Sequence, residues 1–225
     1  MKNYIYLFLL ISIVHYTKAQ GLTKSGEITT NVALSVSSNG AIGASTLVNK
    51  NGQSATATVP LVFGQAYQGG KIFYFFVSGD PGYVEGETHG LIVAKNMMNC
   101  CGSSWGISNT VTGATGNAAG AGFNNNALIV ADQGAGSYAA ALCDQYSAVD
   151  ANSIVFADWY LPSKKELQLL HPVYTSVTTG YNNGTFWSST EESSTNAAGI
   201  RFFDGGYYSG SKTSSTRFVC AIRKF

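Results

Sequence analysis

Short strand-like segments lie on both sides of two helix-like segments in this chain, and this order limits the folds open to it. Residues 71–77, KIFYFFV, form an apolar run short enough for a buried strand, and residues 91–94 predict a second. Further strand patterns follow the helices at 185–190, 197–203, 207–212 and 217–223, with a turn at Asp204-Gly205-Gly206 between the second and the third. Strands, then helices, then antiparallel strands predict the α+β class.

Two helices are predicted between these strands. The first is the alanine-rich segment from Ser137 to about Ser147. The second begins at Ser163, an N-cap that forms a capping box with Glu166, and it ends at Pro172. Residues 99–126, rich in Gly, Ser, Asn and Ala, predict a long irregular loop held by its few aromatic residues.

The segment before this domain has a different composition. Residues 20–65 are rich in Ser, Thr, Asn and Ala, and residues 32–36 alternate apolar with polar side chains as a half-buried strand does. Asn39-Gly40 and Asn51-Gly52 are typical hairpin turns. We therefore expect a β-rich stalk, with a flexible linker as the alternative, followed by the main domain over 66–225.

The first nineteen residues have the pattern of an export signal. Lys2 precedes an apolar run at 4–14, and Thr17 and Ala19 are the small residues that a signal peptidase reads. Eleven apolar residues are too few to span a bilayer, which needs about twenty. We expect an exported protein, periplasmic, cell-surface or extracellular, with no membrane span in the mature chain.

The charge balance argues against a nucleic-acid partner. The net charge is +1, and removal of Lys2 and Lys18 with the signal takes it to −1. A hydrophobic share of 45% with only 11% charged residues also excludes a disordered chain. No metal-ligand spacing occurs, so we expect no metal and no cofactor.

Export makes disulfides possible among the four cysteines. Cys143 lies in the first helix pattern and Cys220 in the last strand pattern, while Cys100 and Cys101 are adjacent. Four cysteines allow three pairings. The adjacent pair could close a vicinal disulfide, remain as thiols or bond elsewhere.

Several segments occur in an order that resembles one bacterial family, the C-terminal domain of the Legionella collagen-like adhesin. The resemblance covers about residues 66–225, and its most specific part is DWYLPSKKEL followed by WSSTE. The other segments are GGKIFYFF, THGLIVA, AAALCDQY and RFVCAIRKF.

The resemblance implies a fold similar to C-type lectin-like and formylglycine-generating-enzyme-like domains. In that layout the first and last strands pair, here 71–77 and 217–223, and a helix cysteine bridges to the last strand, which implies a Cys143–Cys220 disulfide. The adhesin is associated with sulfated glycosaminoglycans and with trimer formation. The calcium motifs of true C-type lectins are absent here.

The candidate ligand-binding residues combine aromatic and basic side chains near the end of the sequence. Planar aromatics stack on sugar rings, and Arg or Lys pairs with sulfate or carboxylate. We predict a site formed by Arg201, Tyr207, Tyr208, Lys212 and Trp105.

Other polar residues are better explained by folding. We expect His89 to stabilise a turn, and Trp159 and Trp187 to be core anchors whose indole N–H groups find internal acceptors. Asp158 either accepts loop N–H groups or lies at the edge of a site. No GxSxG, HExxH or EF-hand spacing occurs, so we predict no catalytic residues.

The leading hypothesis is an exported, non-enzymatic adhesin-like module that binds a glycan or a surface protein. The alternative is a structural subunit that associates with itself, as a trimer for example. A third hypothesis is an oxidoreductase of the formylglycine-generating type.

Overall fold

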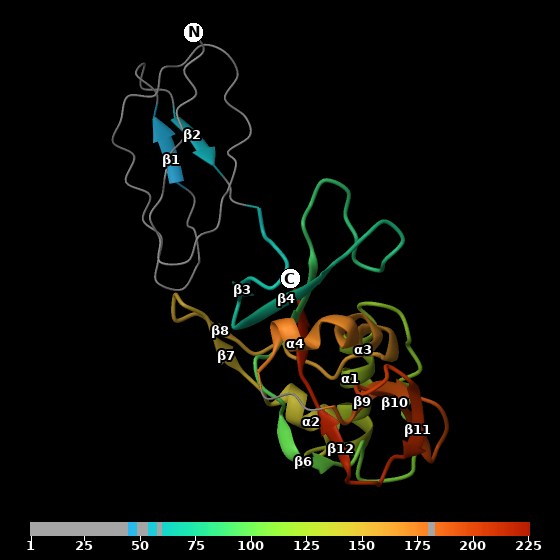
Figure 1. Ribbon diagram of the computed structural model, residues 1–225. Coiled ribbons are helices and arrows are strands. Elements are labelled where there is room, and N and C mark those ends of the chain that lie inside the picture. The colour runs from blue at the N-terminus through green and yellow to red at the C-terminus, as the bar shows by residue number, and fades with distance from the viewer. Residues whose placement is uncertain (1–44, 49–53, 58–59, 180–182) are drawn as a thin grey trace. The chain divides into compact units, whose positions relative to one another are not determined.

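The computed structural model describes residues 45–48, 54–57, 60–179 and 183–225 (Figure 1). The export signal, the strand expected at 32–36 and the Asn39-Gly40 turn lie outside the described residues. The chain forms two compact units, which are described separately. In the first, β1 (Ser45–Val48) and β2 (Ser54–Ala57) pair antiparallel. The Asn51-Gly52 turn expected in this segment also lies outside the described residues.

The second unit contains two main sheets and a small hairpin, and its α+β class is as predicted. The larger sheet has the order β11-β10-β9-β12-β6, and the smaller has the order β13-β5-β4-β3. Neighbouring strands are antiparallel except β12 and β9. The strands are β3 (Ala66–Tyr67), β4 (Gly70–Phe75), β5 (Gly90–Val93), β6 (Asn99–Ser103), β7 (Ala148–Val149), β8 (Val155–Phe156), β9 (Thr185–Glu191), β10 (Asn196–Arg201), β11 (Tyr207–Ser211), β12 (Arg217–Val219) and β13 (Ile222–Lys224).

The segment 217–223, expected to be one strand, is divided between the two sheets. β12 lies between β9 and β6, whereas β13 pairs with β5. The break falls at Cys220 and Ala221, which are both fully buried. Ala221 still accepts a backbone hydrogen bond from Ala94, so the chain passes from one sheet to the other without leaving the core. Residue alternation alone does not reveal such a change of sheet.

The expected pairing of the first and last strands is not found. β4 and β13 belong to the same sheet, but β5 lies between them and pairs with both. The short strand predicted at 91–94 is present as β5, Gly90–Val93, but its central place in this sheet was not predicted.

The helices are more numerous than the two predicted. The helices predicted at Ser137–Ser147 and after Ser163 are present with shorter bounds. A further helix, α1, begins at Gly122, inside the segment 99–126 that was predicted to be a loop. Its GFNNN start contains poor helix formers, and Asn125 and Asn126 are buried because their side chains bond to backbone groups of Gly116 and Leu161. The helical segments are α1 (Gly122–Gln133), α2 (Ala139–Asp144), α3 (Lys164–Leu170), the 3₁₀ turn η1 (His171–Val173) and α4 (Tyr174–Val177).

The start of α3 confirms the predicted capping box. The Ser163 hydroxyl accepts from Glu166 N, and the Glu166 carboxylate accepts from Ser163 N at 2.6 Å. Glu166 is fully buried and also accepts from Gly120 N and Tyr160 Oη. Burial raises the pKa of Glu166, and these hydrogen bonds partly oppose that effect. The cap therefore also fixes the loop before α1.

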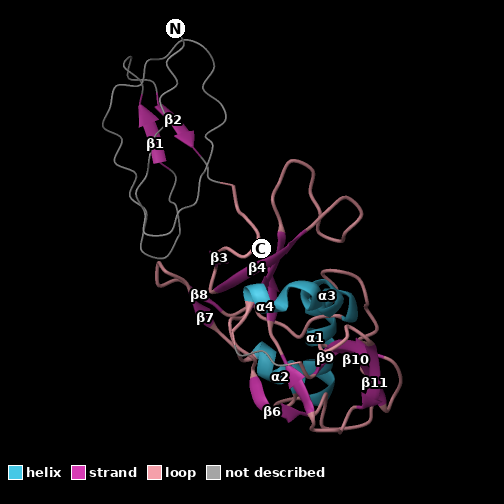
Figure 2. Ribbon diagram, in the orientation of Figure 1, coloured by secondary structure: helices cyan, strands magenta, loops and turns pink. Residues whose placement is uncertain are grey.

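The helices pack against the larger sheet and reach the smaller one. Figure 2 shows α1 and α3 beside β9 and β10, and α3 also contacts β4. Phe186 on β9 and Leu167 on α3 belong to the core between them. The indole N–H groups of Trp159 and Trp187 bond to backbone oxygens of Phe156 and Ser103 at 2.9 Å, which confirms both tryptophans as core anchors.

The structure corrects the expected Cys143–Cys220 disulfide. Cys143 lies on α2 as a buried thiol, and its Sγ is 3.5 Å from the carbonyl oxygen of Cys220. The two residues are neighbours, as the resemblance implied, but hydrogen bonding and packing join them. Burial raises the pKa of the Cys143 thiol well above its ordinary value, which disfavours the reactive thiolate. The side chains of Cys100 and Cys101 lie outside the described residues, so their vicinal bond stays a prediction.

Alkylation of the purified chain, without reductant, tests the state of Cys143. The thiol should be protected in the folded protein and should react once the chain is unfolded, because only burial shields it. Peptide mapping by mass spectrometry reads the result. A Cys143–Cys220 linked peptide would contradict the structure.

Candidate functional site

Buried polar side chains hold the long loop that precedes α1. The Gln133 carboxamide oxygen accepts from the backbone N–H groups of Ile107 and Ser108, each at 2.9 Å. The Glu191 carboxylate accepts from those of Thr112 and Gly113, each at 2.8 Å. The loop therefore has fixed polar anchors in α1 and β9, although few of its own residues are bulky.

Trp105 is part of this anchoring and does not face solvent. Its side chain is fully buried, and its Nε1 donates to the backbone oxygen of Ser188 at 2.7 Å. The prediction that Trp105 contacts a ligand is therefore wrong. The aromatic residue that was expected to hold the loop does so from inside the core.

Lys212 is also buried, so its assignment as a ligand-binding residue is wrong. Its Nζ lies 2.5 Å from Glu191 Oε1, donates to the Thr110 carbonyl oxygen at 2.6 Å, and lies 4.7 Å from the centre of the Trp105 ring. The two charged side chains are 0% and 2% exposed. A buried ion pair is tolerated only when further hydrogen bonds satisfy both partners, and here they do.

Arg201 and Tyr207 do reach the surface, at the closed end of the β10–β11 hairpin. Tyr207 is 46% exposed, and Lys164 Nζ lies 5.1 Å from the centre of its ring. Phe203, between them in sequence, is 62% exposed, with the Arg201 guanidinium 5.5 Å from its ring centre. We call Lys164, Arg201, Phe203 and Tyr207 the hairpin-end cluster. It combines two exposed aromatic rings, each with a cation beside it.

The backbone of this hairpin end is held by a tight turn. Arg201 N donates to Gly206 O at 2.9 Å, and Gly205, with a φ of 72°, occupies the left-handed conformation that glycine favours. Asp204 bonds to the Arg201 guanidinium through both oxygens and accepts from Gly206 N. The Arg201 hydrogen bonds hold the pKa of Asp204 below its ordinary value. The predicted Asp204-Gly205-Gly206 turn is therefore confirmed.

Tyr208 is not brought to the hairpin-end cluster. Its ring packs 5.8 Å from that of Trp187, crosses Gly199 and lies 4.4 Å from the Arg217 guanidinium. A side chain on Gly199 would meet the Tyr208 ring at 3.3 Å and the backbone oxygen of Phe186 at 2.5 Å. Tyr208 is half-buried and serves the packing of the sheet.

Sequence reasoning missed two members of the cluster. Phe203 could have been found from the sequence, because apolar Ile200 and Phe202 alternate with Arg201 and so predict Phe203 on the outward side with Arg201. Lys164 has no such local signal, since only the packing of α3 on β10 brings it to Tyr207.

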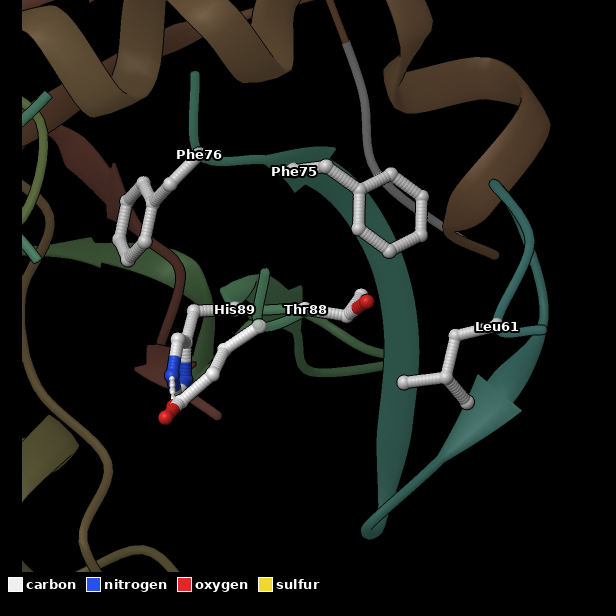
Figure 3. Close-up of a pocket in the computed structure, with 6 residues that line it drawn as sticks. Leu61, Phe75, Phe76, Thr88 and His89 are labelled. Carbon is white, nitrogen blue, oxygen red and sulfur yellow. Dashed lines mark hydrogen bonds and ion pairs between the residues drawn. The ribbon is translucent and has the colours of Figure 1, made fainter. Parts of the chain in front are cut away.

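A shallow pocket of about 260 Å³ lies beside His89 (Figure 3). His89 Nε2 is 2.7 Å from Glu87 Oε2, and Nδ1 is 3.1 Å from the backbone oxygen of Phe225. The hydrogen bond to Glu87 is the main reason that the pKa of His89 is raised. Figure 3 shows the Thr88 hydroxyl turned away from the imidazole, so the pocket does not pair a nucleophile with a base. His89 joins the β4–β5 loop to residue 225, the kind of structural role that was expected.

Asp158, left open between two roles, forms an ion pair. Its carboxylate contacts the Arg223 guanidinium at 2.7 and 2.8 Å, and this pairing holds the pKa of Asp158 below its ordinary value despite partial desolvation.

Among residues whose placement is described, no three His, Cys, Asp or Glu side chains converge as metal ligands. In the same part of the chain, no helix has the length and apolar character needed to cross a membrane.

Neither a protein-family model nor a curated protein matches this chain in a sequence comparison.

Replacement of Lys212 by Met should lower the free energy of unfolding by about 3–5 kcal/mol, because it leaves the Glu191 carboxylate buried without its cation. The double variant Lys212→Met/Glu191→Leu should recover part of that loss. Urea unfolding followed by tryptophan fluorescence measures both. Arg201→Met is the matched control, since it breaks an exposed ion pair and should change stability far less. Equal losses in the two single variants would contradict the anchoring role of Lys212.

The Glu191 carboxylate should also make stability depend on pH. Hydrogen bonds from Lys212, Thr112 and Gly113 outweigh desolvation and lower its pKa in the folded state. The contribution is therefore complete above the ordinary glutamate pKa, about 4.3, and is lost as the pH falls through the lower folded value. The stability difference between the unmodified chain and Glu191→Gln should shrink on acidification. Glu192→Gln, an exposed neighbour, should show a much weaker trend, and identical pH profiles for the two variants would contradict the assignment.

Proposed function

We propose that this chain is an exported, non-enzymatic binding module of the adhesin type, which contacts a glycan or another cell-surface ligand through the hairpin-end cluster. The observation that carries the proposal is the exposure of Phe203 and Tyr207 on a hydrogen-bonded turn, each with a cation beside its ring. Exposed aromatic rings that gather in one place, with cations beside them, offer a surface that a binding partner can cover.

The cluster fits a carbohydrate that carries acidic groups. Aromatic rings offer flat apolar faces for sugar rings, and Arg201 and Lys164 can pair with a sulfate or carboxylate. Because Asp204 holds Arg201 through two hydrogen bonds, the guanidinium loses little freedom when a ligand binds. Because the net charge of the mature chain is −1, the attraction for an acidic glycan would come from the local cations Arg201 and Lys164 and not from the electric field of the whole protein.

The absence of enzyme activity is part of the proposal. Its support is that Glu166, Glu191 and Lys212 are committed to internal hydrogen bonds. The buried Cys143 thiol, with its raised pKa, does not favour an oxidoreductase of the formylglycine-generating type.

We also propose the C-type lectin-like fold and membership in the family of the adhesin C-terminal domain. The packing of α2 on the C-terminal segment, with Cys143 next to Cys220, supports this assignment. The position of β5 between the first and last strands of its sheet is a difference from the expected layout.

One observation favours self-association as a second candidate function. β11 pairs only with β10 among the strands in the described residues, so its other edge is open in the larger sheet. An open edge can accept a strand from another copy of the chain.

A glycan array with the purified chain tests the leading proposal. We expect binding to acidic glycans, and we expect Phe203→Ala and Tyr207→Ala each to weaken it by about tenfold or more, the loss that follows from removal of an anchor worth about 1.4 kcal/mol. Phe63→Ala is the matched control, because Phe63 is another exposed aromatic residue, at 47%, outside the cluster.

Two results would reject the glycan proposal: no binding by monomer or oligomer, or unchanged binding by both cluster variants. Light scattering on the same samples separates the two candidate functions. A stable oligomer without glycan binding would favour self-association, and a monomer in solution would reject it.

A further inference from the structure

A reactive arrangement of polar groups joins the long loop to the C-terminal end of α1. The carboxamide oxygen of Gln133 accepts three hydrogen bonds, from the backbone N–H groups of Ile107 and Ser108 at 2.9 Å each and from the Ser108 hydroxyl at 3.1 Å. Three donors on one carbonyl oxygen polarise its carbon. They are also placed to stabilise negative charge on that oxygen, as an oxyanion hole does.

A hydroxyl and a carboxylate lie beside the same carboxamide. Thr110 Oγ1 donates to Asp132 Oδ2 at 2.5 Å, and Gln133 Nε2 donates to Thr110 Oγ1 at 2.8 Å. The same Asp132 oxygen accepts from Gln133 Nε2 at 2.7 Å. One carboxylate oxygen thus contacts both the hydroxyl that could attack and the nitrogen that could leave.

We propose that Thr110 and Gln133 form an intramolecular ester. Asp132 takes the proton of the Thr110 hydroxyl as Oγ1 attacks the Gln133 side-chain carbonyl carbon. The oxyanion forms against the Ile107 and Ser108 N–H groups, and Asp132 returns the proton to the nitrogen. The bond between Oγ1 and the carbonyl carbon forms, the carbon–nitrogen bond breaks, one ammonia molecule leaves, and Asp132 is regenerated.

The position of the groups favours a single, slow reaction of this kind. Oγ1 accepts from the amide nitrogen at 2.8 Å, so it has to move onto the face of the same carboxamide to reach the carbon. Well-oriented intramolecular reactions reach effective molarities of about 10⁵ M or more, and the step must occur only once in each molecule. Gln133 is only 6% exposed, which limits hydrolysis of the ester, while Thr110 and Asp132 lie at the surface, where ammonia can escape.

The ester would reinforce the anchoring that is already present. The backbone oxygen of Thr110 accepts from the buried Lys212, so the same residue would be fixed covalently to α1 and by hydrogen bonding to the residue that follows β11. This inference is independent of the proposed ligand.

Intact-mass spectrometry of the purified chain and its variants tests the proposal. The unmodified chain and Thr110→Ser, which keeps the hydroxyl, should each lack the mass of one ammonia molecule at this site. Thr110→Val should keep its full mass, and Asp132→Asn should react more slowly. Thr115→Val is the matched control and should still form the ester.

Peptide mapping locates the bond, because ammonia can also be lost elsewhere, as when an N-terminal Gln20 cyclises or an Asn-Gly pair such as Asn183-Gly184 forms a succinimide. Chymotryptic cleavage after Trp105, Phe123 and Tyr138 places Thr110 and Gln133 in different peptides. The proposal requires these two peptides to stay joined in the unmodified chain and to separate after treatment with hydroxylamine, which cleaves esters. Separate, unmodified peptides in the untreated chain would overturn it.

Discussion

The buried ion pair of Lys212 and Glu191 is the interaction on which the arrangement of the main domain most depends. It connects the residue after β11 with the end of β9, and both side chains also bond to the backbone of the loop at 110–113. A loop of this length with few bulky residues would otherwise lose much conformational entropy on ordering. The pair adds fixed polar contacts to the few apolar ones, such as Trp105 and Ala114, that the loop makes with the core.

Other polar groups extend the same arrangement. Gln133 holds the beginning of the loop, Asn125 holds Gly116, and Glu166 holds Gly120 just before α1. Buried polar networks define one geometry when every member is satisfied, because an unpaired buried group is costly. In this protein the low share of charged residues does not mean that charges are unimportant, since the most buried ones determine the path of the loop.

Local signals predicted what local contacts determine. The capping box of Ser163 and Glu166, the aromatic strand β4 and the turn at Asp204 each depend on neighbours in sequence, and each is present. Burial was harder to predict. Lys212 comes directly after β11 and its charge suggested an exposed position, whereas its ion-pair partner Glu191 lies on β9, at a distance in the sequence. Helix α1 was missed in part because buried asparagines, stabilised by distant backbone groups, overrode a poor helix propensity.

The division of 217–224 between two sheets has a consequence for the order of folding. β12 fills the gap between β9 and β6, and β13 adds the edge strand beside β5, so neither sheet is complete before this late segment is available. Contacts between residues so far apart in sequence make folding slow. The exported chain that we propose would have to pass a membrane translocon while still extended, and this delay would favour that passage.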